Sequence, residues 1–141
     1  MNKSTKCRLL FLLMSKGDTI MASNDMQVLM YKILKYLYEC MKLDKEAKLE
    51  DFSYSSKLFD VPKNYWLEVI STLVTYGYIK GFKVYENKYK DYKVYVETDP
   101  PFKITYEGVV FLEENSGMKK ASEFVKDSFN VVLSSLLGVI L

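Results

Sequence analysis

A lysine-rich stretch between residues 80 and 93 is the strongest candidate for chemistry in the sequence. Its five lysines are opposed only by Glu86 and Asp91, and aromatic residues are interleaved between them. Such a pattern could contact the phosphates of a DNA backbone or enter a minor groove. Lysines on an exposed strand also discourage association between sheets, and this interpretation stays open. The five lysines are Lys80, Lys83, Lys88, Lys90 and Lys93.

A second group of polar residues lies at helical spacing between residues 62 and 76. Four apolar residues recur there every three or four positions, which predicts a helix with one buried stripe: Trp66, Val69, Ile70 and Leu73. Residues on the opposite face could contact phosphates or base edges, although Glu68 at its centre repels phosphate unless it accepts from a cytosine amino group. An ordinary solvated helix face explains them equally well. The candidate DNA-contacting residues of this helix are Lys63, Asn64, Ser71 and Thr75.

The composition argues against catalysis. The 141 residues include no histidine, which excludes His-based triads and His-ligated metals. Cys7 and Cys40 form neither a CxxC pair nor a disulfide framework, which indicates a reducing, cytoplasmic compartment. Adjacent acidic pairs cannot be assumed to converge on a substrate, and the sequence has no glycine-rich phosphate loop. We therefore expect no enzyme activity, no cofactor, no metal site and no small-molecule ligand.

Helices in the first half of the chain must position these residues. Periodic apolar residues predict a helix over 25–42. The charged stretch 43–51 is expected to be a loop, and residues 53–60 allow a short second helix. The third helix is expected over 62–76, because proline suits the first position of a helix.

Strand-forming residues follow the third helix. Two runs rich in Tyr, Val, Phe and Ile, at 78–85 and 92–96, predict a β-hairpin with a polar tip. Asp99-Pro100-Pro101 is expected to interrupt the strand pattern, because proline cannot donate to a ladder hydrogen bond. Residues 102–104 could then form a last short strand piece.

Two further helices are predicted to close the chain. Thr105 is placed to cap a helix over 106–115, Ser116-Gly117 interrupts it, and a last helix covers 118–141. Three helices, a hairpin and then additional C-terminal helices form the order of a winged helix-turn-helix, which is an α+β fold. A generic α+β domain with the same elements is the alternative.

The first 20 residues differ from the rest in charge. They carry four basic residues against Asp18, a local +3, and a run of six apolar residues that is too short for a signal peptide. Met21, followed by helix-capping residues, looks like an independent start. We interpret residues 1–20 as an upstream extension, and a short helix that packs onto the domain is the competing interpretation. The winged-helix domain is expected over 21–116 and a C-terminal apolar helix over 117–141.

The last 13 residues are apolar on almost every side. As a helix they would span about 20 Å, short of the ~30 Å hydrocarbon core of a bilayer, so no membrane span is expected. One small domain rarely covers a whole helix circumference, and the sequence therefore predicts a homodimer through this helix. The predicted dimer contacts are Phe129, Val132, Leu133, Leu136, Leu137 and Ile140.

Three motifs carry a resemblance to a known family. The run LVTYGYI at 73–79 resembles the end of a recognition helix entering a wing, and ITYEGVVFL at 104–112 resembles the segment that follows the wing in many winged-helix proteins. Together with FLEENSGMKKA at 111–121, they make residues 25–130 similar to the YjcQ family. The resemblance implies a winged-helix fold and a small protein of phages or mobile elements in low-GC Gram-positive bacteria. It implies no established biochemical activity.

These observations lead to two alternative hypotheses about function, DNA binding and protein interaction. The chain is expected to be a small DNA-binding protein, in one interpretation a transcriptional regulator, that holds double-stranded DNA by helix 62–76 and a lysine-rich wing over 80–93. The net charge of +2 gives no basic footprint for the whole chain, and Arg8 is its only arginine, so phosphate contact is favoured over guanine readout. The rival is a protein-interaction module with the same fold and no DNA binding, because the helix face is not basic.

Overall fold

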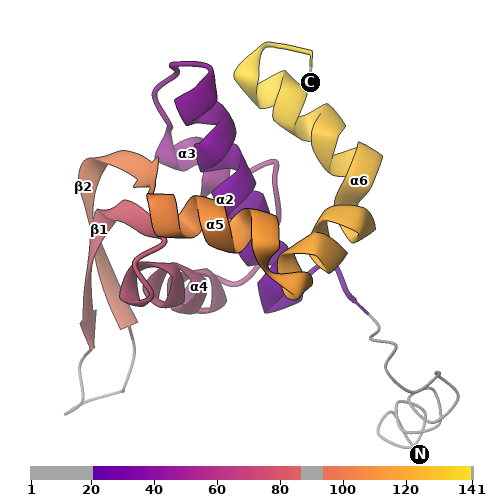
Figure 1. The fold of residues 1–141 in the computed structure, drawn as a ribbon. Coiled ribbons are helices and arrows are strands. Elements are labelled where there is room, and N and C mark those ends of the chain that lie inside the picture. The colour runs from indigo at the N-terminus through magenta and orange to yellow at the C-terminus, as the bar shows by residue number, and fades with distance from the viewer. Residues whose placement is uncertain (1–20, 87–93, 141) are drawn as a thin grey trace, which may run out of the picture.

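The computed structural model describes residues 21–86 and 94–140, which form an α+β fold (Figure 1). In residues 21–86 and 94–140, three helices precede an antiparallel two-stranded sheet and two helices follow it, in the order that the sequence predicts. Within the described residues the elements are α2 (Met26–Lys42), α3 (Leu49–Phe52), α4 (Lys63–Thr75), β1 (Ile79–Glu86), β2 (Val94–Ile104), α5 (Tyr106–Glu114) and α6 (Ser116–Leu137).

Helix α2 is the centre of the core, and its predicted position is confirmed. Helices α4, α5 and α6 and strand β2 all pack against it. Apolar residues on most of its circumference are therefore buried, and so is the carboxylate-bearing Glu39. That carboxylate accepts hydrogen bonds from Lys35 at 3.0 Å and Lys42 at 2.7 Å, which compensates its removal from water.

The short second helix lies earlier than the sequence predicts. Helix α3 covers 49–52, inside the expected loop, and residues 53–60 form turns instead of a helix. Two side chains explain the difference. The Tyr36 hydroxyl of α2 donates to Asp51 at 2.7 Å and accepts from the Lys48 backbone at 3.1 Å, while the Ser56 hydroxyl accepts from the Leu58 backbone and favours a local turn.

Helix α4 has the predicted buried stripe. Trp66, the largest member of the stripe, donates its indole N–H to the Phe52 carbonyl at 2.9 Å and packs edge-on against Phe82 of β1. These contacts fix α4 against both α3 and the sheet. Pro62 is the residue before the helix rather than its first turn, and the chain leaves α4 through Gly77, whose φ of 76° suits glycine.

Strand β2 runs through the two prolines, so the predicted interruption at Asp99-Pro100-Pro101 is wrong. Lys80 pairs with Lys103 and Phe82 with Thr98, which leaves Gly81 opposite several extra residues of β2. Prolines fit this irregularity because no ladder hydrogen bond is required of them there. A Cβ atom on Gly81 would lie 2.6 Å from the Phe102 ring, so the sheet requires glycine at this close approach.

Helices α5 and α6 each begin with a capping side chain. The Thr105 hydroxyl, predicted to cap α5, accepts from the Gly108 backbone at 3.0 Å and donates to the Gly77 carbonyl at 2.5 Å. The Asn115 side chain accepts from the Met118 backbone at 3.1 Å, so α6 starts at Ser116 instead of being delayed by Ser116-Gly117. Helix α6 kinks at Lys126 and ends at Leu137, before the expected 141, with Gly138 in the left-handed region.

The apolar end of α6 folds back onto α2 of its own chain, as Figure 1 shows. Phe129 packs edge-on against Tyr31, and the Tyr31 hydroxyl donates to Ser122 at 3.2 Å. Leu133 is fully buried and Leu137 nearly so. This corrects the expectation that a second chain must cover Phe129, Leu133 and Leu137, because α2 offers a long apolar surface. The buried apolar residues of α6 thus belong to the same core as α2, α4 and the sheet.

Candidate nucleic-acid interface

The outer face of α4 carries three of its four predicted DNA-contacting residues. Lys63, Asn64 and Thr75 are exposed, and so is Glu68 at the centre of the face. Ser71 is buried, which makes its assignment as a contact wrong. It follows Ile70 by about 100° around the helix, and the buried arc of α4 is wide enough to include it, because α2 and both strands pack against this helix.

The solvent-facing side of the hairpin holds a cluster of lysines. Lys80 and Lys83 are exposed, as predicted. The register places Lys103 directly opposite Lys80, and neither forms an ion pair with any residue that the structure describes. Sequence reasoning missed Lys103. Its position between the buried Phe102 and Ile104 was the available signal, because alternate residues of a strand face opposite sides.

Tyrosines lie beside these lysines farther along the hairpin. Tyr85 and Tyr95 are cross-strand partners and both are exposed. The Tyr85 hydroxyl donates to Glu97 at 3.2 Å, and Glu97 is itself the partner of Lys83 in the register. The solvent face of the sheet therefore combines lysines, tyrosine rings and one carboxylate. Such a face should bind a phosphate backbone more weakly than a purely basic face.

The remaining predicted contacts, Lys88, Lys90 and Lys93, lie outside the described residues. The hairpin ends that lead to them can still be placed. Figure 1 shows these ends beside α4 at the lower end of the view, and α4 packs against both strands. The ends of β1 and β2 that lead to this connection therefore lie at the same end of the molecule as α4.

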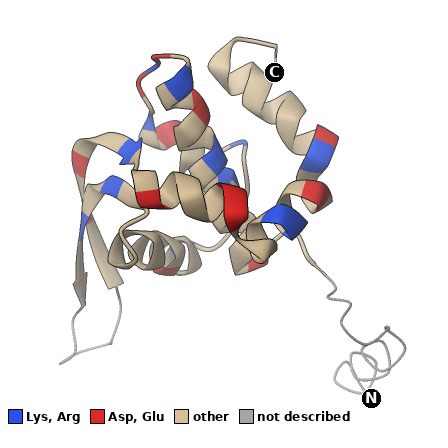
Figure 2. Ribbon diagram, viewed as in Figure 1, with Lys and Arg blue, Asp and Glu red and all other residues tan. Residues whose placement is uncertain are grey.

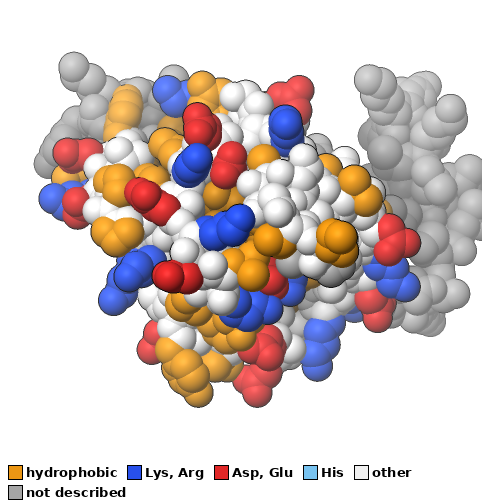
Figure 3. Space-filling model, turned by 90° about the horizontal axis from the view of Figure 1, so that it is seen from above, with side chains coloured by type: hydrophobic (Ala, Val, Ile, Leu, Met, Phe, Trp, Pro, Cys, Tyr) orange, Lys and Arg blue, Asp and Glu red, His pale blue; other side chains and the backbone are white. Residues whose placement is uncertain are grey.

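Charge is unevenly divided between the described residues and the rest of the chain. The described residues contain 13 lysines and 16 carboxylates, a formal net charge of −3. The two segments outside them, 1–20 and 87–93, carry +3 and +2. Figure 2 shows basic and acidic residues dispersed over the helices. The space-filling view from above likewise shows both signs intermixed with apolar side chains (Figure 3). No single charged face dominates either view.

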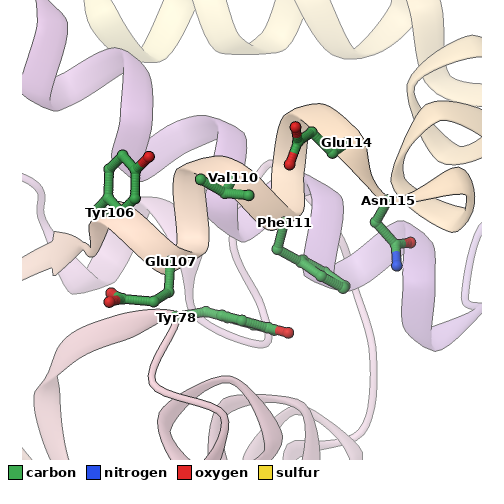
Figure 4. A pocket seen from close by; sticks show the side chains of 7 residues that line it. All are labelled: Tyr78, Tyr106, Glu107, Val110, Phe111, Glu114 and Asn115. Atoms are coloured by element: carbon green, nitrogen blue, oxygen red, sulfur yellow. The ribbon is translucent and has the colours of Figure 1, made fainter.

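A second surface, which sequence reasoning missed, lies between α5 and the connection from α4 to β1. It is an open groove of about 450 Å³, which we call the α5 groove (Figure 4). Tyr78 stacks on Phe111 with ring centroids 4.4 Å apart, and on Tyr76 at 5.9 Å. Aromatic rings and carboxylates are combined here without a lysine. The residues lining the groove are Tyr78, Tyr106, Glu107, Val110, Phe111, Glu114 and Asn115.

Residues 21–86 and 94–140 contain neither a metal-binding cluster nor a membrane-spanning helix. No group of three or more His, Cys, Asp or Glu side chains there could hold a metal ion. No described helix is both long enough and apolar enough to span a membrane. Burial raises the pKa of the Cys40 thiol, the one free cysteine among the described residues, which lowers the reactivity of that thiol.

The predicted dimer contacts divide into two groups. Phe129, Leu133 and Leu137 belong to the core described above. Val132 and Leu136 are half-buried, and Ile140 is fully exposed. Only this second group is available to a second chain, so the predicted dimer would have a smaller apolar contact than the sequence suggests.

Comparison with protein families finds one match. A family model described as YjcQ protein matches residues 31–128, which span α2 to the middle of α6. No curated protein and no solved structure matches the chain.

Proposed function

The chain belongs to the YjcQ family, and from that premise we propose that it is a small DNA-binding protein built on a winged helix-turn-helix. Helices α2, α3 and α4 would form the helical part, α4 would be the recognition helix, and β1 with β2 would form the wing. The order of these elements supports the proposal. The shortness of α3, four residues, makes the second helix of the motif unusually small.

The observation that carries the proposal is the placement of α4 beside the hairpin ends that lead into the lysine-rich connection 87–93 (Figure 1). The major groove of B-DNA admits one α-helix. With the outer face of α4 in that groove, the connection would reach the adjacent backbone. Lys88, Lys90 and Lys93 would then neutralise phosphates, and Lys83 would extend the basic edge along β1.

Individual residues of α4 would have different roles. Lys63 would contact a phosphate, because it lies exposed at the beginning of the helix. The Asn64 amide can both donate to and accept from an adenine edge. Glu68 would be tolerated only opposite a cytosine amino group, which predicts a sequence preference instead of general affinity. The Thr72 hydroxyl already donates to the Glu68 carbonyl at 2.9 Å, which leaves Thr75 as the exposed hydroxyl of the face.

A salt titration tests the proposal. The full chain should bind random genomic DNA fragments at low salt, with log K falling linearly against log salt. Lys88→Ala/Lys90→Ala/Lys93→Ala should flatten the slope by ~0.9 for each phosphate that is no longer neutralised. The matched control is Lys119→Ala/Lys120→Ala, which removes two exposed lysines from α6 and should leave the slope nearly unchanged. Asn64→Ala should change sequence preference more than salt dependence.

A second candidate function, a protein-interaction module, is favoured by one observation. The described residues carry a net charge of −3 and include the aromatic α5 groove. Absence of DNA binding by the full chain at low salt would refute the first proposal and favour this one. A triple variant that binds DNA with an unchanged salt slope would refute the role of the 87–93 connection.

We infer a cytoplasmic protein of a phage or mobile element that acts by binding alone, without catalysis or a cofactor. A homodimer would place two α4 helices at a fixed spacing on DNA. Val132, Leu136 and Ile140 are the predicted contacts that remain accessible for such a dimer.

A further inference from the structure

The α5 groove has a regular pattern of charge and apolarity along its helix. Glu107, Val110, Phe111 and Glu114 recur at intervals of three and four, so they share one face of α5. The two carboxylates lie toward the two ends of α5 with Val110 and Phe111 between them (Figure 4). Phe111 lies over the ring of Tyr78, whereas the Glu114 side chain is turned away from that ring. Both carboxylates are exposed and form no ion pair with a described residue. A matching ligand would be apolar in the middle and basic at both ends.

One segment of this chain has that complementary pattern. The apolar run LLFLLM at 9–14 is preceded by Arg8 and followed two residues later by Lys16. The segment 1–20 carries a net charge of +3, whereas the face of α5 presents two carboxylates and no lysine. Opposite charges at both ends of two apolar surfaces favour contact and fix its register along the helix.

Helix α2 begins close to one end of the groove. A Cβ atom on Gly117 would lie 2.5 Å from the Gln27 side chain and 3.0 Å from that of Asn115, so the start of α2 borders the Asn115 end of the groove. Figure 1 shows the start of α2 beside the junction of α5 and α6. Met21 follows Lys16 by five positions, which is enough chain to cover about 16–18 Å when extended. Residues 107–114 of α5 cover only about 10 Å.

We propose that residues 8–16 dock into the α5 groove of their own chain. Lys16 pairs with Glu114, Arg8 pairs with Glu107, and the apolar run covers Tyr78, Val110 and Phe111. The inference goes beyond DNA binding and does not depend on it. It favours the interpretation of residues 1–20 as a segment that packs onto the domain over their interpretation as an inert extension.

Attachment to the same chain makes weak docking sufficient. A short linker gives an effective concentration in the millimolar range, so an intrinsically weak contact is still populated. Ion pairs between exposed side chains contribute little individually. The segment should therefore occupy the groove reversibly, and the core of residues 21–140 should not depend on it for folding.

The chain offers a natural handle for testing the docking. Cys7 adjoins Arg8, whereas Cys40 is only 3% exposed and its burial makes it unreactive in the folded protein. A nitroxide label attached to Cys7 of the full-length protein should strongly broaden the amide signals of residues 107–111 in nitrogen–proton NMR spectra. Reduction of the nitroxide should restore these signals. Broadening that is equal on all exposed amides, or none at all, would overturn the proposal.

Charge variants make the test specific. Glu107→Lys/Glu114→Lys should abolish the broadening, and adding Arg8→Glu/Lys16→Glu should restore it. Glu113→Lys/Glu123→Lys makes the same charge change at two exposed sites outside the groove and should leave the broadening intact. The spectra themselves report whether each variant is folded. Broadening that survives Glu107→Lys/Glu114→Lys would overturn the proposal, and so would broadening found only between a labelled chain and a separate isotope-enriched chain.

Discussion

Helices α4 and α6 illustrate how similar patterns of apolar residues can lead to different surfaces. Both bury one stripe against α2. The partners of α4 include the hairpin that follows it directly, whereas α6 returns to a helix about 90 residues earlier, as the hydrogen bond between Tyr31 and Ser122 shows. The outer face of α4 is polar. The outer face of α6 keeps Phe124 and Val131 exposed, and Val131 lies in the apolar segment that the sequence assigns to a dimer.

The two helices differ in how many of their apolar side chains the rest of the chain covers. The stripe of α4 leaves few apolar side chains without a partner, so its outer face is free for a polar ligand. Helix α6 has more apolar residues than one neighbour can cover, and α2 takes the half that it can reach. The remaining apolar residues of α6 are available to a second chain. The sequence alone cannot distinguish these residues from the buried ones.

The largest expected effect is on the buried half of α6. Leu133→Ala should lower the free energy of unfolding by about 2–5 kcal/mol, because the side chain is fully buried and its removal leaves a cavity. Val131→Ala is the matched control on the same helix, where the side chain is 70% exposed, and should change stability by about 0.5 kcal/mol or less. Urea unfolding measures both. Equal destabilisation of the two variants would mean that α6 does not pack against α2 in this register.

A smaller effect is expected on α4, where substitutions on the buried face should lower stability and substitutions on the outer face should not. Trp66→Phe removes the indole N–H and leaves the buried Phe52 carbonyl without its partner, which should cost about 1–3 kcal/mol. Asn64→Ala, on the outer face, should change stability by about 0.5 kcal/mol or less. Chemical unfolding of both variants checks this. A large destabilisation by Asn64→Ala would show that the outer face is structural and weaken its assignment to DNA.

The smallest effect concerns Glu39 on α2, the helix shared by α4 and α6. Burial by itself raises the pKa of Glu39, but hydrogen bonds from Lys42 and Lys35 outweigh it and hold the pKa below its usual value. A lowered pKa in the folded state stabilises the fold above the unfolded-state pKa of ~4.3, and this contribution disappears as the pH falls through the folded-state pKa. Because the lysines are partly exposed, the contribution should be about 1 kcal/mol or less.

Urea midpoints measured from pH 7 down to pH 3 test this contribution. Glu39→Gln should lose part of the acid-induced decline in stability that the unchanged protein shows below the unfolded-state pKa. Glu113→Gln, at an exposed carboxylate of α5, is the control and should follow the unchanged protein. Parallel curves for all three proteins would contradict the lowered pKa of Glu39.

Much of the fold could be predicted because its signals are local. The stripe of α4, the turn at Gly77 and the cap at Thr105 depend on residues within a few positions of one another. Helix α3 could not be predicted in the same way. Residues 49–52 lie in a charged stretch, and they become helical where Tyr36, some 12 to 15 residues earlier, binds both Lys48 and Asp51.

The candidate site was likewise predictable only in part. Exposure of Lys63, Asn64, Lys80 and Lys83 follows from periodicity. Burial of Ser71 does not, because the width of the buried arc depends on how many elements pack against α4. Strand β2 continues through Pro100 and Pro101 because it accommodates several extra residues opposite Gly81. The prolines indicate an irregularity, but they do not show that the strand pairing resumes beyond it.

The sequence by itself determined the class of fold, the order of its elements and the residues able to form an apolar core, because side-chain periodicity and capping act within one or two turns of chain. Only the tertiary structure decided which apolar side chains that core absorbs. Helix α6 and helix α2 meet across most of the chain, and the α5 groove combines Tyr78 with a helix that begins 28 residues later. Contacts at such separations depend on the packing of all elements together, and no local pattern encodes them.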